Sequence, residues 1–248
     1  MLSPRMRARI GAMQRKYGLQ WPRRGTVNFG DLRRVTPVSA SFGMDRGKAI
    51  DRYYIEAFLR ENQAYIKGRA LELGDPYYIE TFGGGKVTQA DVLHVVAGNP
   101  IATVIADLTD APHIPDNSFD CIIFTQSIQM IYDFHAALRT LHRILKPGGT
   151  VLLTTAGIAK IGRRLGRDDW GEYWHFTSQS VDALVKEHFP GAQAEVKTWG
   201  NVLAATAFLH GLAIEEMEAA ELEYCDPDFE VLVTARITKA GTGAGGRA

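Results

Sequence analysis

The sequence predicts a doubly wound α/β fold, and two observations carry this prediction. First, short apolar strand patterns alternate with helical patterns along most of the chain. Second, residues 114–155 contain a complete strand–helix–strand unit whose helix ends at a Lys-Pro-Gly-Gly turn. Such a unit brings the chain back for a parallel strand, which is how parallel sheets are built. With 248 residues, the chain is long enough for one large domain of this class or two small ones.

Seven strands are expected where short apolar runs lie between turn residues. Their ranges are 69–73, 87–91, 103–107, 119–124, 150–155, 193–198 and 229–237. Because these strands alternate with helices, they should form a doubly wound sheet. Ligands of such sheets bind at the carboxyl ends of the strands, so the site is expected there.

Helices are expected over six segments, most of which have apolar residues at helical spacing. Their ranges are 6–17, 48–66, 134–145, 177–188, 201–212 and 215–224. Thr177 is a good N-cap for the fourth of them. Asp75-Pro76 is a further helix start, and the glycines at 83–85 should end that helix after about two turns.

Composition divides the chain into three parts. Residues 1–47 are expected to form a basic N-terminal extension or lid, 48–238 the α/β domain, and 239–248 a disordered tail. Apolar residues make up 46% and charged residues 23%, which is typical of a soluble globular protein. The sequence has no apolar run near the roughly 18 residues of a membrane span, and its N-terminus lacks the apolar core of a signal peptide.

Cysteine and histidine usage favours a cytoplasmic protein without a metal. Of the two cysteines, Cys121 falls in an expected buried strand, so we expect no disulfide. The seven histidines are scattered without close ligand spacing, so we expect no metal site.

Charge is unevenly distributed although the net charge is zero. The segment through Lys48 has eleven basic and two acidic side chains and therefore carries +9, which leaves −9 on the rest. One interpretation is an arm for an anionic partner, such as a nucleotide sugar, a lipid phosphate, a membrane surface or a nucleic acid. The alternative is an arm that packs on the acidic body or on a sister subunit of a homodimer.

The sequence of residues 114–155 also resembles that of a known family. PDNSFDCII at 115–123, followed by LHRILKPGGTVLLTT at 141–155, is similar to the later half of class I S-adenosylmethionine-dependent methyltransferases of the type 11 kind. This resemblance implies a Rossmann-like methyltransferase sheet whose last strand is antiparallel and inserted beside the fifth. It also implies S-adenosylmethionine as the methyl donor.

The donor site implied by the resemblance begins at the end of the first strand. The family has an acid and a Gly-x-Gly-x-Gly loop there. This chain keeps Glu72 and Gly74 but places Asp75-Pro76-Tyr77 where further glycines belong. Glu72, Gly74 and Asp75 are expected to hold the amino-acid end of the donor, and an ordinary strand-to-helix turn is the alternative.

Three further strand ends complete the expected donor site. The resemblance implies that Asp91 accepts hydrogen bonds from the ribose hydroxyls, and that Asp107 with Leu108 contacts the adenine. Thr125 and Gln126 follow the fourth strand, in the crevice where donor and acceptor should meet. A loop with its own hydrogen bonds satisfied is the alternative for this last pair.

Residues 170–177, Trp-Gly-Glu-Tyr-Trp-His-Phe-Thr, are the expected acceptor side of the site. They resemble a DYWRFT segment of several bacterial methyltransferases, with His175 in place of arginine. The aromatic faces of Trp170, Tyr173 and Trp174 suit a sugar ring or a sulfonium cation. His175 has the reference pKa of a group that can accept a hydroxyl proton near pH 7. The alternative is a structural aromatic cluster with a hydrogen-bonded histidine.

Arg52, Tyr53 and Tyr54 precede the first strand and are expected to close the site from the other side, although both tyrosines fit equally well as core residues.

The predicted function is S-adenosylmethionine-dependent O-methylation of a small molecule, with a sugar or glycan as the preferred acceptor. A catalytically inactive methyltransferase-like binding or scaffold protein is the alternative, because the first motif is altered. A nicotinamide-dependent oxidoreductase would need a Gly-x-Gly-x-x-Gly loop that residues 74–79 lack. The basic arm leaves nucleic-acid modification open.

Overall fold

The chain divides into two compact units, Met1–Val38 and Ser39–Ala248, and the computed structural model describes residues 3–163 and 171–241. The smaller unit contains helix α1 (Pro4–Tyr17), which buries none of its residues. Ser3 caps the start of α1, because its side chain accepts a hydrogen bond from the Met6 N–H. The helix expected in this region is confirmed.

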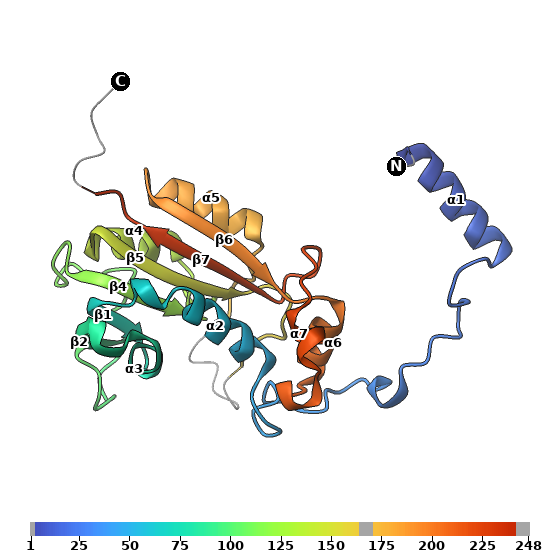
Figure 1. Cartoon of the computed structure of the whole chain (residues 1–248), viewed down its shortest axis with the longest axis horizontal. Coiled ribbons are helices and arrows are strands. Elements are labelled where there is room, and N and C mark those ends of the chain that lie inside the picture. Colours follow the sequence, from blue (N-terminus) through green and yellow to red (C-terminus); the bar gives the residue numbers. More distant parts are fainter. Residues whose placement is uncertain (1–2, 164–170, 242–248) are drawn as a thin grey trace. The chain divides into compact units, whose positions relative to one another are not determined.

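The larger unit is built on a seven-stranded sheet with the strand order β3-β2-β1-β4-β5-β7-β6 (Figure 1). The strands are β1 (Gly68–Leu73), β2 (Val87–His94), β3 (Val104–Ile105), β4 (Phe119–Thr125), β5 (Leu145–Ala156), β6 (Gln193–Trp199) and β7 (Leu232–Thr238). Strands β1 to β5 pair in parallel, whereas β7 is antiparallel to both β5 and β6. This confirms the predicted doubly wound, mostly parallel sheet, including the reversed last strand beside the fifth.

Helices cover both faces of this sheet. They are α2 (Ile50–Glu61), α3 (Tyr77–Gly83), α4 (Phe134–Ile144), α5 (Ser178–His188), α6 (Val202–His210) and α7 (Ala219–Glu223). Buried side chains of α4 and α5 join one core cluster, whereas those of α2, α3, α6 and α7 join a second. Figure 1 shows α5 and α2 on opposite sides of the sheet. Among the residues that the structure describes, no helix is long and apolar enough to cross a membrane.

The edge of the sheet at β2 and β3 differs from the sequence prediction. β2 runs three residues beyond Asp91 and ends at His94, because its last residues still pair with β1 and β3. β3 is reduced to two residues. A loop over residues 95–103 joins the two strands without a helix, so this edge has less helical cover than the rest of the sheet.

Two expected boundaries near the C-terminus also change. The helix expected at 215–224 is divided into a 3-10 turn, Ile214–Glu216, and α7. The division occurs because Glu218 starts a new helix, its N–H donating to the side chain of Glu221. β7 begins later than residue 229, since the Phe229 N–H first donates to the Asp226 carbonyl and closes a turn.

The first residues of the larger unit, 39–49, lie against the segment that follows α6. Gly43 and Gly211 both have positive φ, and both approach backbone carbonyls closely. A Cβ on Gly211 would lie 2.2 Å from the Ser39 oxygen, and one on Gly43 would lie 2.6 Å from the Leu212 oxygen. This close backbone approach holds residues 39–49 beside the carboxyl edge of the sheet.

Candidate functional site

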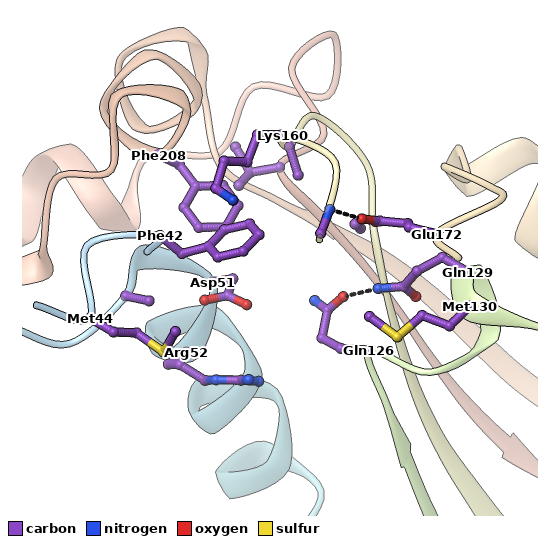
Figure 2. A pocket seen from close by; sticks show the side chains of 15 residues that line it. Phe42, Met44, Asp51, Arg52, Gln126, Gln129, Met130, Lys160, Glu172 and Phe208 are labelled. Atoms are coloured by element: carbon purple, nitrogen blue, oxygen red, sulfur yellow. Dashed lines mark hydrogen bonds between the residues drawn. The ribbon is translucent and has the colours of Figure 1, made fainter. Parts of the chain in front are cut away.

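A cavity of about 180 Å³ opens at the carboxyl ends of β4 and β5 (Figure 2). Its walls come from five parts of the larger unit: residues 42–49, the first turn of α2, the segment after β4, the segment after β5, and α6 with the loop before β7. The side chains labelled in Figure 2 are Phe42, Met44, Asp51, Arg52, Gln126, Gln129, Met130, Lys160, Glu172 and Phe208. The cavity therefore lies where the fold class places its ligands.

Asp51 is the acid of the α2 wall. It occupies the first turn of α2, where a carboxylate is favoured by the helix dipole. Figure 2 shows its carboxylate among the cavity-lining side chains, facing the Gln126 side. Burial raises the pKa of Asp51, and the neighbouring Arg52 charge opposes this increase. The cavity thus contains a carboxylate that is a stronger base than an exposed aspartate.

Two amides form the opposite wall. Gln126 stands at a positive φ of 48° just after β4, and its N–H donates to the Thr154 carbonyl of β5. The Gln129 Nε2 donates to the Gln126 Oε1 at 2.5 Å, and the Thr155 hydroxyl donates to the Gln129 Oε1 at 3.0 Å. Because the Gln126 oxygen is already used, its NH2 is the group left to donate to a ligand.

Lys160 and Glu172 add one charge of each sign to the cavity. The Lys160 ammonium lies 3.5 Å from the centroid of the Phe42 ring, and burial lowers the pKa of Lys160. Glu172 accepts a short hydrogen bond from the Gly162 N–H and lies 3.2 Å from His175 Nε2. The carboxylate of Glu172 therefore joins the cavity to the expected catalytic histidine.

His175 does not line this cavity. It lines a second, more open cavity together with Thr177, Ser178 and Glu230, and it reaches the first only through Glu172. The expectation that His175 faces the acceptor directly is therefore not met by the geometry of the described residues.

The aromatic segment is ordered by the loop after β4. The N–H groups of Tyr173 and Trp174 donate to the Gln129 carbonyl. Their rings lie 5.3 Å and 5.9 Å from the Tyr132 ring, so they form one cluster beside the cavity rather than a part of its wall. Trp170, which was also expected in the acceptor site, lies outside the described residues.

The three residues expected to close the site from α2 have different positions. Arg52 lines the cavity, and its Nη1 donates to the Tyr78 hydroxyl at 3.4 Å. Tyr54 is 1% exposed and its hydroxyl donates to the Leu222 carbonyl, so the expectation that it binds substrate is wrong. Tyr53 packs edge-on against Tyr54 and against the core, which agrees with the alternative interpretation.

Glu72 supports the first loop instead of facing a ligand. Its two carboxylate oxygens accept the N–H groups of Tyr78 and Ile79, at 3.1 Å and 2.8 Å. These N–H groups belong to the first turn of α3, so Glu72 fixes the start of that helix. The expected direct contact between Glu72 and the donor is therefore replaced by a supporting role, because both oxygens are in use and the side chain is 3% exposed.

The stability of the protein should depend on pH through Glu72. Burial raises the pKa of Glu72 to about 8, although the two N–H donors lower it. The folded state therefore holds a proton that the unfolded chain releases at acidic pH. This contribution is complete below the unfolded pKa and is lost as the pH rises through 8. We expect urea unfolding to show a loss on the order of 4 kcal/mol between pH 5 and pH 8.5. The Glu72→Gln variant should lose less over the same range, and an equal loss would contradict this assignment.

Gly74 and Asp75 leave the end of β1 open. Gly74 has a φ of 87°, and a Cβ placed on it would meet no heavy atom within 4 Å. Its N–H donates to the Leu93 carbonyl and its own carbonyl accepts from Asn99. Asp75 is exposed and its Oδ1 accepts the Tyr77 N–H. A ligand can thus approach the Gly74 backbone from solvent.

Asp91, the acid expected to bind the ribose, does not lie at the end of its strand. Asp91 lies inside β2 and is 4% exposed. Its carboxylate accepts from Arg69 at 2.7 Å, from Thr103 at 2.8 Å and from Gln89 at 3.0 Å. These partners lower the pKa of Asp91 against the effect of burial. The prediction that Asp91 ends its strand and offers its oxygens to a ribose is therefore wrong, and His94 occupies the strand end.

The other strand ends match their expected positions. Asp107 is exposed just after β3 and accepts from the Thr109 N–H and hydroxyl through Oδ1. Leu108 beside it is 3% exposed and belongs to the core. Thr125 is the last residue of β4 and its carbonyl accepts the Ser127 hydroxyl. Gly74 and Thr125 thus lie at the carboxyl ends of the neighbouring strands β1 and β4, whereas Asp107 follows β3, which β2 separates from β1.

Comparison with known proteins agrees with this topology. The solved structure of the (4+2)-cyclase SpnF superposes with a TM-score of 0.51 at 18% identity, covering 79% of this chain and 84% of that chain, which concerns the fold alone. A model of the methyltransferase domain matches residues 83–153. Residues 83–153 of the chain are thus similar to the methyltransferase domain family. The matched residues begin after β1, so the altered loop at Gly74 lies outside them.

Curated relatives share only part of the chain. The ubiquinone/menaquinone biosynthesis C-methyltransferase UbiE of Proteus mirabilis (strain HI4320) is 32% identical over 129 residues, which are 46% of this chain and 50% of that protein. The UbiE protein of Enterobacter sp. (strain 638) is 43% identical over 44 residues, which are 18% of each chain. The chain thus spans half or less of the length of these relatives.

Several cavity residues were not expected from the sequence. Asp51, Gln129 and Lys160 carry no motif of their own, and Glu172 lies within the 170–177 segment but was not expected to line the site. The one available signal was the position of Asp51 at the start of an expected helix, next to Arg52. Only the folded sheet edge brings these residues together.

Proposed function

We propose that this chain transfers the sulfonium methyl group of S-adenosylmethionine to a hydroxyl oxygen of a small-molecule acceptor, of sugar or glycan type. The S–CH3 bond breaks as the O–CH3 bond forms, the sulfur keeps the bonding electron pair, and the hydroxyl proton passes to a base. The observation that carries this proposal is the cavity between Asp51 and Gln126, at the carboxyl edge of a sheet with the strand order of the family. Alignment of the two reactants there can supply up to roughly 7–11 kcal/mol of the barrier reduction.

The donor is proposed to lie along the strand ends that precede the cavity. The open backbone at Gly74 would accept its amino-acid end, with Asp75 at the rim. Asp107, whose Oδ2 accepts no hydrogen bond within the described residues, and Leu108 would contact the nucleoside. Thr125 and Gln126 would then bring the sulfonium methyl to the cavity.

Asp51 is proposed as the proton acceptor in preference to His175. Asp51 lines the cavity, and its pKa is raised by burial, which brings it nearer to the operating pH. His175 faces a different cavity and is paired with Glu172. The role left to His175 is to hold the Glu172 carboxylate at the cavity wall.

A sugar or glycan acceptor is supported by the aromatic cluster beside the cavity. The rings of Tyr132 and Tyr173 are 71% and 53% exposed, and such faces suit the apolar side of a sugar ring. The UbiE relatives are named as C-methyltransferases, so a carbon nucleophile is the competing acceptor. The position of an isotopically labelled methyl group in the product, read by NMR, distinguishes a new O–CH3 from a new C–CH3.

Donor affinity should depend on Asp107. A hydrogen bond to a charged group contributes about 1.5–3 kcal/mol, so Asp107→Ala is expected to weaken S-adenosylhomocysteine binding by roughly 10–100-fold in calorimetry. Asp182→Ala is the matched control, because Asp182 is a half-exposed acid of α5 that pairs with Lys186 and lines neither cavity. Equal affinity of the two variants would remove Asp107 from the donor site.

An inactive binding or scaffold protein is the second candidate. It is favoured by the first loop, where Glu72 is fully used by α3 and Pro76 replaces a glycine of the family pattern. Calorimetry with S-adenosylmethionine separates the two candidates. Saturable 1:1 binding supports the enzyme, whereas no heat at millimolar donor with a folded protein supports the scaffold.

The basic smaller unit is proposed to take an anionic partner. Helix α1 has Arg15 and Lys16 in its last turn, no acid in its first turn and no buried residue. Its cationic side chains are therefore exposed within this unit. Binding to anionic vesicles or to nucleic acid that weakens with added salt would support this role.

A further inference from the structure

Three potential metal ligands meet between the ends of α4 and α5. His135 is the second residue of α4, and Glu187 and His188 are the last two residues of α5. His135 Nδ1 lies 2.7 Å from His188 Nε2. The Glu187 Oε1 lies 3.6 Å from the first nitrogen and 3.5 Å from the second. The three ligand atoms thus form a small triangle with one atom from each residue.

The triangle has the size that a first-row divalent ion requires. With bonds of about 2.0–2.1 Å, two ligands of a tetrahedral ion lie about 3.3 Å apart. Two edges of the observed triangle are slightly longer than this value and one is shorter. An ion would therefore have to separate the two imidazoles by about half an ångström, a movement that the exposed His135 side chain can make.

The chemical types of the three ligand atoms also suit a divalent metal ion. Two imidazoles and a carboxylate are ligands that zinc accepts in proteins, and imidazole suits cobalt, nickel and copper as well. The site belongs to neither of the cavities described above, since none of its residues lines them. It is separate from the proposed methyl-transfer site and does not depend on that function.

We propose that His135, Glu187 and His188 form a binding site for a divalent transition-metal ion, zinc foremost, with a fourth position open to water. The bound ion would link the start of α4 to the end of α5, two helices that pack on the same face of the sheet. Phe134 precedes His135, and its ring lies 5.4 Å from the Trp174 ring and 5.3 Å from the Phe176 ring. The ion would thereby also brace the aromatic segment.

Two features set the expected strength of the site. His188 is buried and fixed, whereas His135 and Glu187 are exposed and must be ordered when the ion binds. The positive charge of Arg139 also acts on His188 and opposes a cation. Binding should therefore be weaker than at a closed four-ligand site.

The sequence predicted no metal site because close ligand spacing along the chain was absent. His135 and His188 are separated by 53 residues, and only the packing of α4 against α5 brings them together. Without an ion, one hydrogen bond joins the two imidazoles, and the Glu187 carboxylate lies 3.5–3.6 Å from their nitrogens. The experiment must separate these two arrangements.

The test uses the full chain after chelator treatment and dialysis, titrated with zinc chloride and, in parallel, with cobalt chloride. We expect saturable 1:1 binding by calorimetry and the visible absorption of four-coordinate cobalt. Excess zinc should raise the melting temperature by about 5–10 °C at 100 times the dissociation constant. Glu187→Gln and His135→Ala should each weaken binding about 10–100-fold.

His113→Ala is the matched control, since His113 is an exposed histidine outside the cluster whose ring bonds the Ile105 carbonyl. This variant should bind zinc as the unaltered chain does. Because His188 is buried, its replacement is avoided, and both informative variants lie on exposed side chains. Lack of a saturable 1:1 isotherm, or an affinity that is the same in His135→Ala and His113→Ala, would show that the cluster is only a hydrogen-bonded histidine pair beside a carboxylate.

Discussion

Asp51→Asn is expected to lower the turnover number by about 10²–10⁴-fold, the range that general-base catalysis contributes. Asparagine keeps the shape of the side chain at the start of α2 but cannot take up the proton of the acceptor hydroxyl. Donor binding should be unchanged, because Asp51 lies on the acceptor side of the cavity. Formation of S-adenosylhomocysteine, measured with an acceptor found by screening hydroxylated sugars, reports the loss.

The pH dependence of the activity should also identify Asp51 as the proton acceptor. Burial raises the pKa of Asp51, so activity should fall on acidification at a pH above the usual range of an aspartate. His175→Gln tests the proton acceptor expected from the sequence, and Asp182→Asn on exposed α5 is the neutral control. A large loss in His175→Gln with an active Asp51→Asn would reverse the assignment of the base.

Gly211→Ala is expected to destabilise the larger unit by on the order of 3–4 kcal/mol. Gly211 has a φ of 70°, where an alanine costs about 1–2 kcal/mol of backbone strain. Its new Cβ would also lie 2.2 Å from the Ser39 oxygen, a contact that forces residues 39–47 away from the end of α6. Urea unfolding gives the free energy, and the loss of Phe42 from the cavity wall should reduce activity in parallel.

Gly191→Ala is the matched control for this clash. Gly191 also has a positive φ, of 73°, but its Cβ would meet only the Ala240 methyl at 3.7 Å. It should therefore lose only the strain energy. If the two variants unfold at the same urea concentration, the close approach of Ser39 to Gly211 contributes nothing, and the docking of residues 39–47 is weaker than the structure indicates.

The parts of the fold that could be predicted are those fixed by local pattern. The strand–helix–strand unit from 114 to 155 and the Thr177 cap were correct, since alternation, capping and turn residues act over a few positions. The reversed last strand was also correct, but it was implied by the family resemblance and not by a local pattern. The end of β2 was expected at Asp91 but lies three residues later, at His94. An aspartate is usually exposed to solvent, but Asp91 is buried because Arg69 of β1 donates a hydrogen bond to its carboxylate. The sequence of β2 alone does not reveal this partner.

Two of the expected donor-side residues, Gly74 and Asp107, could be placed from the sequence more readily than the residues that line the cavity. Gly74 and Asp107 lie at strand ends, which the alternation of strands and helices locates. Asp51, by contrast, reaches the cavity because residues 39–49 and α2 fold over the ends of β4 and β5. Tyr54 illustrates the converse, because an aromatic residue near the site turned out to be core. Long-range packing decides both cases, and no local pattern encodes it.

The most direct test of the central claim is a crystal structure of the full chain with S-adenosylhomocysteine. We expect density across Gly74 and Asp107, with the thioether sulfur directed toward the cavity between Asp51 and Gln126. Density at another edge of the sheet, or a sulfur directed away from that cavity, would contradict the assignment of this cavity as the place of methyl transfer.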